Sequence, residues 1–318
     1  MVLLGAITPA LAQAPKADEV LAAVVGVHAE VPAMARTADS LGTSRNGSGI
    51  VIGADGLVLT IGYLILEAGA VDIIDASGKT KPAALVAYDN DSGFGLLRSL
   101  QPLDAQPIGL GDSAALKPLD RVLIASRSDG LAVEQGMIAG RRELAGYWEY
   151  LLPDAVFAVP PHAEFGGAAL IDRNGRLVGV GSLLVGDAAG DGTAVPGNMY
   201  VPIDALKPIL QDLVAHGRRT GPQHPWLGVY AEADRGGVRV LQIAEGGPAE
   251  KAGLQRGDLI TGVAGTSVND LADFYRQVWA LGPAGVAVPL DIEGAAGPRQ
   301  ITVRSLDRYQ WLRLDPTF

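Results

Sequence analysis

One residue pair with a spacing that suits acid–base chemistry is His162 and Glu164. Residues two apart lie on one face of an extended segment, where an imidazole and a carboxylate can exchange a proton. No serine, cysteine or metal-ligand motif stands near them in the sequence, so we interpret this segment as a solvated loop. The other histidines, His28, His216 and His224, lie far from it along the chain.

Sequence motifs for metals and cofactors are missing as well. The chain has no H-E-x-x-H motif, no phosphate-binding loop and no C-x-x-C pair, and it contains no cysteine. We therefore expect neither a metal nor a cofactor. The net charge of −10 argues against nucleic acid as a partner.

The elements that must position any active side chains are short strands. Of the 318 residues, 48% are hydrophobic and 42 are glycine, whereas only 5% are aromatic. Short Val, Ile and Leu runs between Gly, Asp and Asn turns are typical of antiparallel sheets. The length allows two or three domains, so we expect a mainly β fold with more than one core.

A series of these segments resembles, in order, the trypsin-like serine proteases of the HtrA/Deg kind. Residues 47–60 match that family's opening hairpin with its G-S-G start, and residues 110–113 match its L-G-D-S motif. Residues 163–180 take the place of its G-N-S-G-G-P-L segment and the following hairpin, and residues 200–203 that of its closing strand. The resemblance implies two six-stranded β-barrels with a cleft between them, which we place at residues 15–212.

The departures from this resemblance fall on the catalytic triad. The family's histidine falls on Tyr63, its aspartate on Gly93 and its serine on Phe165, and its first oxyanion glycine is Ala163. Acyl transfer needs a hydroxyl nucleophile, an imidazole base and an orienting carboxylate. A tyrosine with a pKa near ~10 cannot be that base at neutral pH. The sequence therefore predicts a pseudoprotease, unless a hydroxyl or thiol lies within hydrogen-bonding distance of an imidazole in the cleft.

A domain boundary is expected after the barrels. Apolar residues three and four apart predict one helix over residues 205–214. The polar, Gly- and Pro-containing segment that follows breaks this period, so we place a linker at residues 213–225. His216 and His224 flank this linker, and we expect both to be exposed.

Residues 226–305 resemble a PDZ domain of the HtrA sort. Residues 247–260 follow the family's G-S-P-A-x-x-A-G-L-x-x-G-D-x-I pattern closely. A strand is expected at 259–263, a helix capped by Asn269-Asp270, and two strands at 286–292 and 300–303. The tail, residues 306–318, ends in an apolar residue and either enters a PDZ groove or packs on the domain surface.

The PDZ resemblance implies a peptide-binding groove. PDZ domains add an extended C-terminal peptide as a strand, and main-chain amides meet its carboxylate. The resemblance places that loop and strand at Trp226, Leu227, Gly228 and Val229, and the side-chain pocket at Phe274, Tyr275 and Val278. The alternative is that these three helix residues belong to the core, as we expect for Val278 and one of the two aromatic residues.

The first residues favour export. Residues 1–14 are apolar and end in an A-x-A pattern, as signal peptides do, although no basic segment precedes them and the start looks truncated. About a dozen apolar residues cannot span a bilayer, and no other window reaches that length. We therefore expect a periplasmic or otherwise exported protein without a membrane span.

Three classes of function remain open. The first is an inactive HtrA-like protein that binds peptide C-termini or unfolded segments, as an adaptor, a holdase or a partner of an active relative. The second is a serine endopeptidase of protein quality control, and the third is a structural interaction subunit. The three substituted triad positions favour the first over the second. By family resemblance, the protein could assemble as a trimer through its N-terminal segment.

Overall fold

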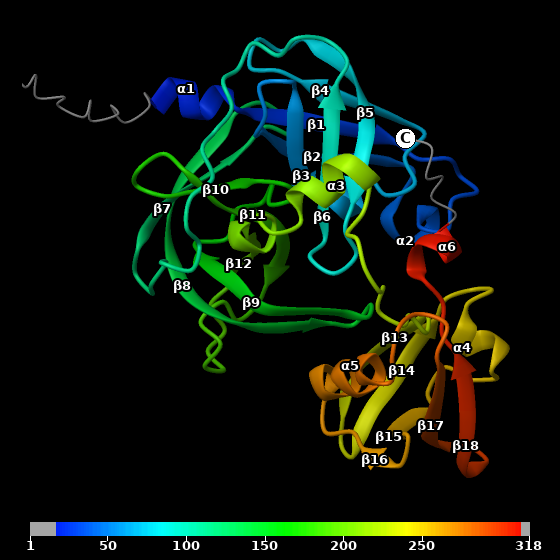
Figure 1. Ribbon diagram of the computed structural model, residues 1–318. Coiled ribbons are helices and arrows are strands. Elements are labelled where there is room, and N and C mark those ends of the chain that lie inside the picture. The colour runs from blue at the N-terminus through cyan, green and yellow to red at the C-terminus, as the bar shows by residue number, and fades with distance from the viewer. Residues whose placement is uncertain (1–16, 313–318) are drawn as a thin grey trace, which may run out of the picture.

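The computed structural model describes residues 17–312 of the chain, which form three sheet systems (Figure 1). The predicted export segment and the last six residues of the predicted tail lie outside this range. Two closed barrels share the N-terminal part, and an open sheet with its own helices forms the C-terminal part. The predicted mainly β architecture is confirmed.

The first barrel has six antiparallel strands in the order β1-β2-β3-β6-β5-β4. The predicted opening hairpin is β2 and β3, and its turn uses the positive φ of Gly56 at +79°. The short helices α1 (Ala17–Ala22) and α2 (Ala38–Leu41) flank β1. The strands are β1 (Val24–Glu30), β2 (Ser44–Val51), β3 (Leu57–Ile61), β4 (Ala70–Ile74), β5 (Thr80–Tyr88) and β6 (Phe94–Ser99).

The second barrel has the strand order β10-β11-β12-β9-β8-β7. Its hairpin β10-β11 turns where the Asp172 carboxylate accepts hydrogen bonds from the backbone N–H groups of Asn174 and Arg176. Strands β8 and β9 form a long hairpin that reaches from the barrel to the C-terminal sheet (Figure 1). The strands are β7 (Arg121–Ser126), β8 (Ala132–Gly146), β9 (Tyr150–Val159), β10 (Ala169–Ile171), β11 (Leu177–Val185) and β12 (Gly197–Pro202).

One apolar cluster joins the two barrels. It contains fully buried side chains of both, for example Ile50 and Leu96 of the first barrel and Phe157 and Val201 of the second. A shared core fixes the two barrels against each other, because their separation would expose this surface to water. The segments that meet between the two barrels are therefore held in place by this shared core.

The prediction of one helix over residues 205–214 is wrong in part. A short 3-10 helix, η2 (Ile203–Ala205), is followed by turns, and the α-helix α3 covers only Leu210–His216. Pro208 explains the interruption, because proline lacks a backbone N–H and restrains the residue before it from helical geometry. The buried side chains of Leu206, Ile209 and Leu213 still pack on the barrel core.

The C-terminal domain is a sheet of strand order β13-β14-β15-β17-β18, with β16 beside β15. Helix α5 (Leu271–Ala280) packs on it, and the predicted cap is confirmed because the Asp270 side chain accepts a hydrogen bond from the N–H of Asp273. The other elements are β13 (Val229–Asp234), β14 (Gly237–Ile243), α4 (Pro248–Lys251), β15 (Leu259–Val263), β16 (Thr266–Ser267), β17 (Ala287–Gly294) and β18 (Gly297–Arg304).

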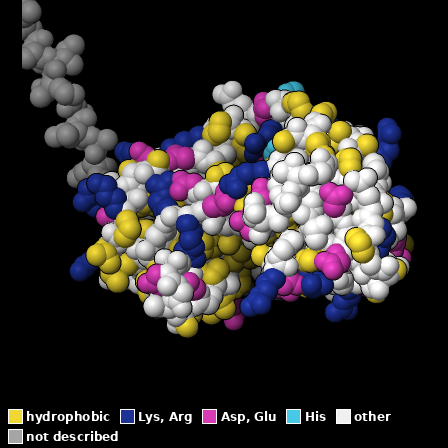
Figure 2. All heavy atoms as spheres, turned by 90° about the horizontal axis from the view of Figure 1, so that it is seen from below, with side chains coloured by type: hydrophobic (Ala, Val, Ile, Leu, Met, Phe, Trp, Pro, Cys, Tyr) yellow, Lys and Arg dark blue, Asp and Glu magenta, His cyan; other side chains and the backbone are white. Residues whose placement is uncertain are grey.

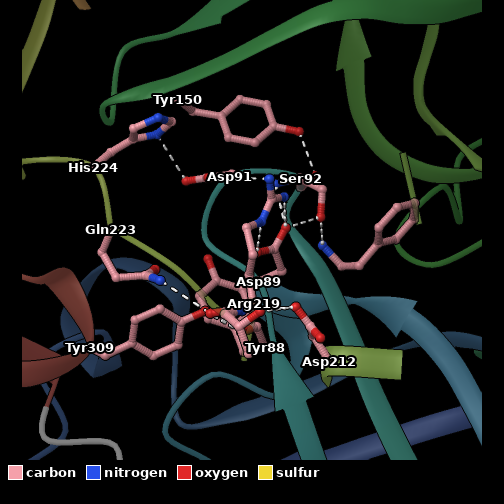
Figure 3. Close-up of polar contacts among 12 residues, drawn as sticks. Tyr88, Asp89, Asp91, Ser92, Tyr150, Asp212, Arg219, Gln223, His224 and Tyr309 are labelled. Atoms are coloured by element: carbon pink, nitrogen blue, oxygen red, sulfur yellow. Dashed lines mark hydrogen bonds and ion pairs between the residues drawn. The ribbon is translucent and has the colours of Figure 1, made fainter. Parts of the chain in front are cut away.

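The linker is attached to the first barrel rather than free (Figure 3). The Arg219 guanidinium lies 2.8 Å from the buried Asp89 carboxylate and 3.6 Å from that of Asp91. His224 is exposed as expected, yet its Nδ1 lies 3.3 Å from Asp91, and its ring stacks on Trp279 of α5 at 4.1 Å between centroids. These contacts connect the barrel, the linker and the C-terminal domain.

The tail packs at the junction of the domains. Leu306 pairs with Trp226 in an isolated antiparallel bridge, and helix α6 (Arg308–Leu312) places Trp311 4.7 Å from the Trp226 ring. Trp311 and Leu312 are buried in a small apolar cluster with Leu66 of the first barrel. The described part of the tail therefore fastens the C-terminal domain to the first barrel.

Charge is spread over the surface. On the face seen in Figure 2, basic and acidic side chains are interspersed. Within residues 17–312, no helix has both the length and the apolar character needed to cross a membrane.

Candidate functional site

The three predicted triad positions converge at the cleft between the barrels. Tyr63 lies on the 3-10 helix η1 (Gly62–Leu64) after β3, Gly93 precedes β6, and Phe165 precedes β10. The N–H of Gly62 donates to the carbonyl of Gly93 at 2.7 Å, and a Cβ added to Gly166 would lie 3.1 Å from the Tyr63 hydroxyl. The backbone therefore brings together the positions that the sequence resemblance singled out.

Tyr63 serves as a hydrogen-bond donor in this cleft. Its hydroxyl donates to the carbonyl of Ser182 at 3.0 Å. Burial raises the pKa of Tyr63 well above its usual value, because the interior disfavours the phenolate. The side chain is therefore neutral at physiological pH and has no lone pair basic enough to deprotonate a hydroxyl.

Gly93 leaves the carboxylate position without a side chain. Its φ is +81°, and an added Cβ would lie 3.6 Å from the Tyr150 ring and hydroxyl. The Tyr150 hydroxyl donates to the carbonyl of Ser92 at 2.8 Å. A phenol therefore lines the place of the orienting acid, and an aspartate there would have to adopt left-handed backbone geometry.

The loop that holds Phe165 is locked onto the first barrel. The carbonyl of Gly166 accepts from the N–H of Ser48 at 2.9 Å, and a Cβ on Gly167 would lie 1.9 Å from the Ser48 carbonyl oxygen. The Phe165 ring is half-buried, and Ala163 is exposed. The loop keeps a tight path while its central side chain is inert.

The expectation that His162 lies in a solvated loop is wrong. The ring is buried, with only 3% of the residue exposed. Its Nε2 lies 2.8 Å from the Ser126 hydroxyl, and its Nδ1 lies 3.0 Å from a Glu134 oxygen. Neither partner is near His162 in the sequence, because β7 and β8 bring them from 36 and 28 residues away.

Glu164 is bound to serine hydroxyls instead of pairing with His162. Its carboxylate accepts from Ser126 at 3.1 Å and also from Ser128. The Ser128 hydroxyl is the main cause that holds the pKa of Glu164 below its usual value, and the Ser126 hydroxyl and the charge of His162 add to it.

The proton count decides what this cluster can do. A serine hydroxyl has one hydrogen, and a carboxylate only accepts. Glu134 also only accepts, so Nδ1 of His162 carries a hydrogen. If the Ser126 hydrogen points to Glu164, Nε2 must donate as well, and a ring with two N–H groups cannot take a proton from the hydroxyl. If the hydrogen points to Nε2 instead, Ser128 alone donates to Glu164. Ser126 is fully buried, so a substrate carbonyl has no access to its oxygen. We interpret the cluster as a support for the loop of residues 160–165.

The predicted carboxylate-binding loop of the C-terminal domain does hold a carboxylate. The N–H groups of Leu227, Gly228 and Val229 donate to the Glu149 side chain at 2.9, 2.6 and 2.7 Å. Trp226, also predicted for this loop, instead packs against Trp311. Burial raises the pKa of Glu149 to about 7, although the three N–H groups and Arg308 act in the opposite direction.

Sequence reasoning missed Glu149, although the sequence holds a signal for it. Residues 147–149 form a three-residue turn between the paired residues Gly146 and Tyr150. The last residue of such a turn is often left-handed and favours glycine, and Glu149 has a φ of 57° there. A glutamate at a position that favours glycine indicates that its side chain makes a contact that offsets the backbone cost.

The three helix residues predicted to line the groove belong to the domain core. Phe274, Tyr275 and Val278 are only 1, 1 and 2% exposed. The expectation that Val278 and one aromatic residue belong to the core is therefore confirmed, and the pocket placement is wrong for Phe274 and Val278, which pack in the core cluster on one face of α5. Tyr275 is buried as well, but its hydroxyl donates to the carbonyl of Gly146 at 2.7 Å and accepts from the N–H of Glu149 at 3.1 Å.

Two protein-family models match the chain. Residues 47–180 match the trypsin-like peptidase domain, and residues 225–293 match the PDZ domain. The chain therefore combines a domain of trypsin-like peptidase architecture with a PDZ domain.

Curated proteins that are similar to this chain are proteases by name. The chain is 28% identical to "Serine protease PepD" of Mycobacterium tuberculosis over 91% of its own length and 66% of that protein. It is 30% identical to "Protease Do-like 1, chloroplastic" of Arabidopsis thaliana, over 73% of its length and 57% of the relative. It is 27% identical to "Periplasmic serine endoprotease DegP" of Escherichia coli K12, over 77% of its own length and 54% of the relative. The chain thus spans about half to two thirds of these relatives.

Solved structures share the fold. "HtrA-type protease AlgW with decapeptide" superimposes with a TM-score of 0.54 at 19% identity, covering 91% of this chain and 96% of that one. The serine endoprotease from Yersinia pestis gives a TM-score of 0.53 at 21% identity, with the same coverage. The domain pair and the HtrA and DegP relatives support the membership of this chain in the HtrA-type protease family.

Proposed function

We propose that this chain is an HtrA-type protein without peptidase activity that binds peptide C-termini or unfolded segments through its PDZ domain. The first half of this proposal, the absence of peptidase activity, is supported by the residue types at the three triad positions. Tyr63, Gly93 and Phe165 meet where the resemblance puts the triad, and none of them can attack, deprotonate or orient. In subtilisin, loss of the nucleophile alone lowers turnover about a millionfold.

Incubation of the purified protein with casein tests this half. We expect no cleavage by the natural chain and none by a Phe165→Ser variant, because the base and the orienting acid would still be missing. A fluorophosphonate probe, which labels activated serines, should leave both proteins unlabelled. Cleavage that co-purifies with the natural chain and is blocked by the probe would contradict the proposal.

The second half of the proposal is supported by the loop at residues 227–229. Its three N–H groups already hold a carboxylate at hydrogen-bonding distance, which is the chemistry that a peptide C-terminus requires. Two solved structures of one HtrA-type relative, AlgW, contain a decapeptide and a tripeptide. We infer that this chain acts as an adaptor or holdase, or as a regulator of an active relative.

One observation favours a second candidate, a serine endopeptidase with a displaced catalytic group. Ser126, His162 and Glu134 are hydrogen-bonded in the order of a serine, a base and an acid. The burial of Ser126 and its contact with Glu164 argue against it. If a casein-cleaving activity is found, Ser126→Ala should abolish it, whereas Ser128→Ala, which also removes a hydroxyl from Glu164, should not.

We also propose that the protein is exported, most simply to the periplasm. The apolar residues 1–14 and the periplasmic relative DegP support this location. Fractionation of cells that produce the full chain tests it, with a variant lacking residues 1–14 as the control. Recovery of both proteins in the cytoplasmic fraction would contradict export.

A further inference from the structure

We propose that the β8-β9 hairpin closes the PDZ groove from within the same chain, with the Glu149 side chain in the place of a peptide's C-terminal carboxylate. This inference rests on the proposed peptide-binding function and adds a regulation to it. The hairpin belongs to the second barrel and crosses to the C-terminal domain (Figure 1).

The contact at the loop is the one that a peptide ligand would make. Both Glu149 oxygens are engaged: Oε2 accepts from Leu227, and Oε1 accepts from Gly228 and Val229. Three successive main-chain amides that point at one carboxylate form an anion-binding nest. A free C-terminus would need the same three donors, so the two carboxylates exclude each other.

The backbone of the hairpin tip also takes the place of an added strand. β13 is an edge strand of its sheet, with β14 on one side only. On the open side, the N–H of Ala231 donates to the carbonyl of Tyr147 at 2.8 Å. Peptides bind PDZ domains by pairing with this edge, so the tip blocks the start of that pairing.

Side chains complete the closure. Leu151, which follows the tip, is 8% exposed and belongs to the core cluster of the C-terminal domain, and Ala145 packs against the same cluster. The Tyr275 hydroxyl of α5 holds the hairpin backbone at Gly146 and Glu149. The tip is therefore held from the strand side, the loop side and the helix side.

The backbone geometry of the tip agrees with this role. Left-handed backbone geometry is unfavourable for a non-glycine residue, and Glu149 has a φ of 57°. Glycine would avoid that cost in this turn but would provide no carboxylate. Contact with the three amides offsets the cost.

Closure in the same chain has a predictable consequence for affinity. A tethered group competes at an effective concentration on the order of millimolar, so the apparent affinity of the chain for an external peptide is lower than that of the open groove. Anything that withdraws the hairpin would open the groove. The groove is then regulated by the position of the second barrel's hairpin.

The test compares the full natural chain with Glu149→Gly, which removes the carboxylate and suits the left-handed turn. Glu143→Ala is the matched control, because Glu143 lies on the same hairpin and pairs with Arg276 of α5 without touching the loop. The probe is a mixture of fluorescein-labelled random decapeptides ending in free Val, Leu or Phe carboxylates, with the amidated mixture beside it. We expect Glu149→Gly to bind the free acids at least tenfold more tightly than the other two proteins.

Hydrogen exchange of the Leu227, Gly228 and Val229 amides gives a readout that needs no peptide. We expect it to be faster in Glu149→Gly than in the natural chain and Glu143→Ala. Unchanged exchange, or equal peptide affinity of all three proteins, overturns the closure alone. Faster exchange without binding of the free acids by any of the proteins overturns the proposed peptide-binding function, and with it the regulation. Equal binding of amidated and free peptides also argues against a carboxylate site.

Discussion

The site between the two barrels and the PDZ groove differ in which of their parts, backbone geometry or chemical groups, are suited to the function of the family. In the cleft, the backbone still brings three positions together, but Tyr63, Gly93 and Phe165 no longer supply the groups of a triad. In the groove, the donors of the loop at residues 227–229 are intact, but Glu149 of the same chain occupies them. The comparison teaches that a similar retained backbone geometry can carry side chains unsuited to a triad in one region, and can be covered by a side chain of the same chain in the other.

The largest effect is expected in the cleft, from Gly167→Ala. The φ of Gly167 is +75°, and the new Cβ would lie 1.9 Å from the Ser48 carbonyl oxygen, so the loop would have to leave the first barrel. We expect a loss of about 3 kcal/mol or more in the free energy of unfolding, measured by urea denaturation.

Gly192→Ala provides the control for this prediction. Gly192 has a similar φ of +85°, but no atom lies within 4 Å of its added Cβ, so only the backbone cost of about 1 kcal/mol remains. Equal losses for the two variants would mean that the cleft loop is not locked, and the contrast between a rigid cleft and a movable groove contact would fail.

A change of pH is expected to have a smaller effect, on the closure of the groove by Glu149. Docking shifts the Glu149 pKa from 4.5 to about 7, so the closed form takes up a proton. Closure is therefore strongest below pH 4.5, weakens as the pH rises through about 7, and changes by at most tenfold per pH unit. Arg308 and the phenols of Tyr147, Tyr230 and Tyr275 are the other titratable groups around this site.

The free energy of unfolding of the natural chain relative to Glu149→Gln, which cannot ionise, measures this dependence by urea denaturation at pH 5 and pH 8. We expect the natural chain to lose stability relative to that variant at the higher pH, because the docked group binds its proton more tightly than the free one. A natural chain that gains relative stability at pH 8, or identical pH profiles of the two proteins, would contradict the assignment to Glu149.

The smallest effect is expected from Tyr63→Phe. The variant loses one hydrogen bond to the carbonyl of Ser182 and leaves that oxygen without this donor, which costs about 1 kcal/mol in the free energy of unfolding. Peptide binding should not change, because the cleft and the groove are separate sites. Altered peptide affinity in this variant would show that the two regions are coupled.

Much of the fold follows from local patterns that the sequence displays. The hairpins β2-β3 and β10-β11 follow from apolar runs around Gly56 and Asn174-Gly175, and the start of α5 from Asp270. The helix over residues 205–214 was predicted wrongly because the apolar spacing outweighed Pro208, whose effect is equally local.

The site contacts depend on distant segments, and sequence reasoning found fewer of them. His162 meets Ser126 and Glu134 because β7 and β8 lie beside its loop, so neither the burial nor the partners of the ring can be inferred from its neighbours in sequence. Helical spacing predicted that Val278 and one of the two aromatic residues are buried, whereas the burial of both aromatic residues depends on how α5 is turned on its sheet.

The sequence by itself determined the order of strands and turns, the substitution of the triad positions and the presence of a carboxylate-binding loop, because each depends on residue type and short spacing. Only the tertiary structure decided what fills that loop. Glu149 and Leu227 are 78 residues apart, and their contact requires the β8-β9 hairpin to reach across to the C-terminal domain. No local pattern specifies how two separately folded sheets dock, because docking depends on the shape and polarity of both surfaces together.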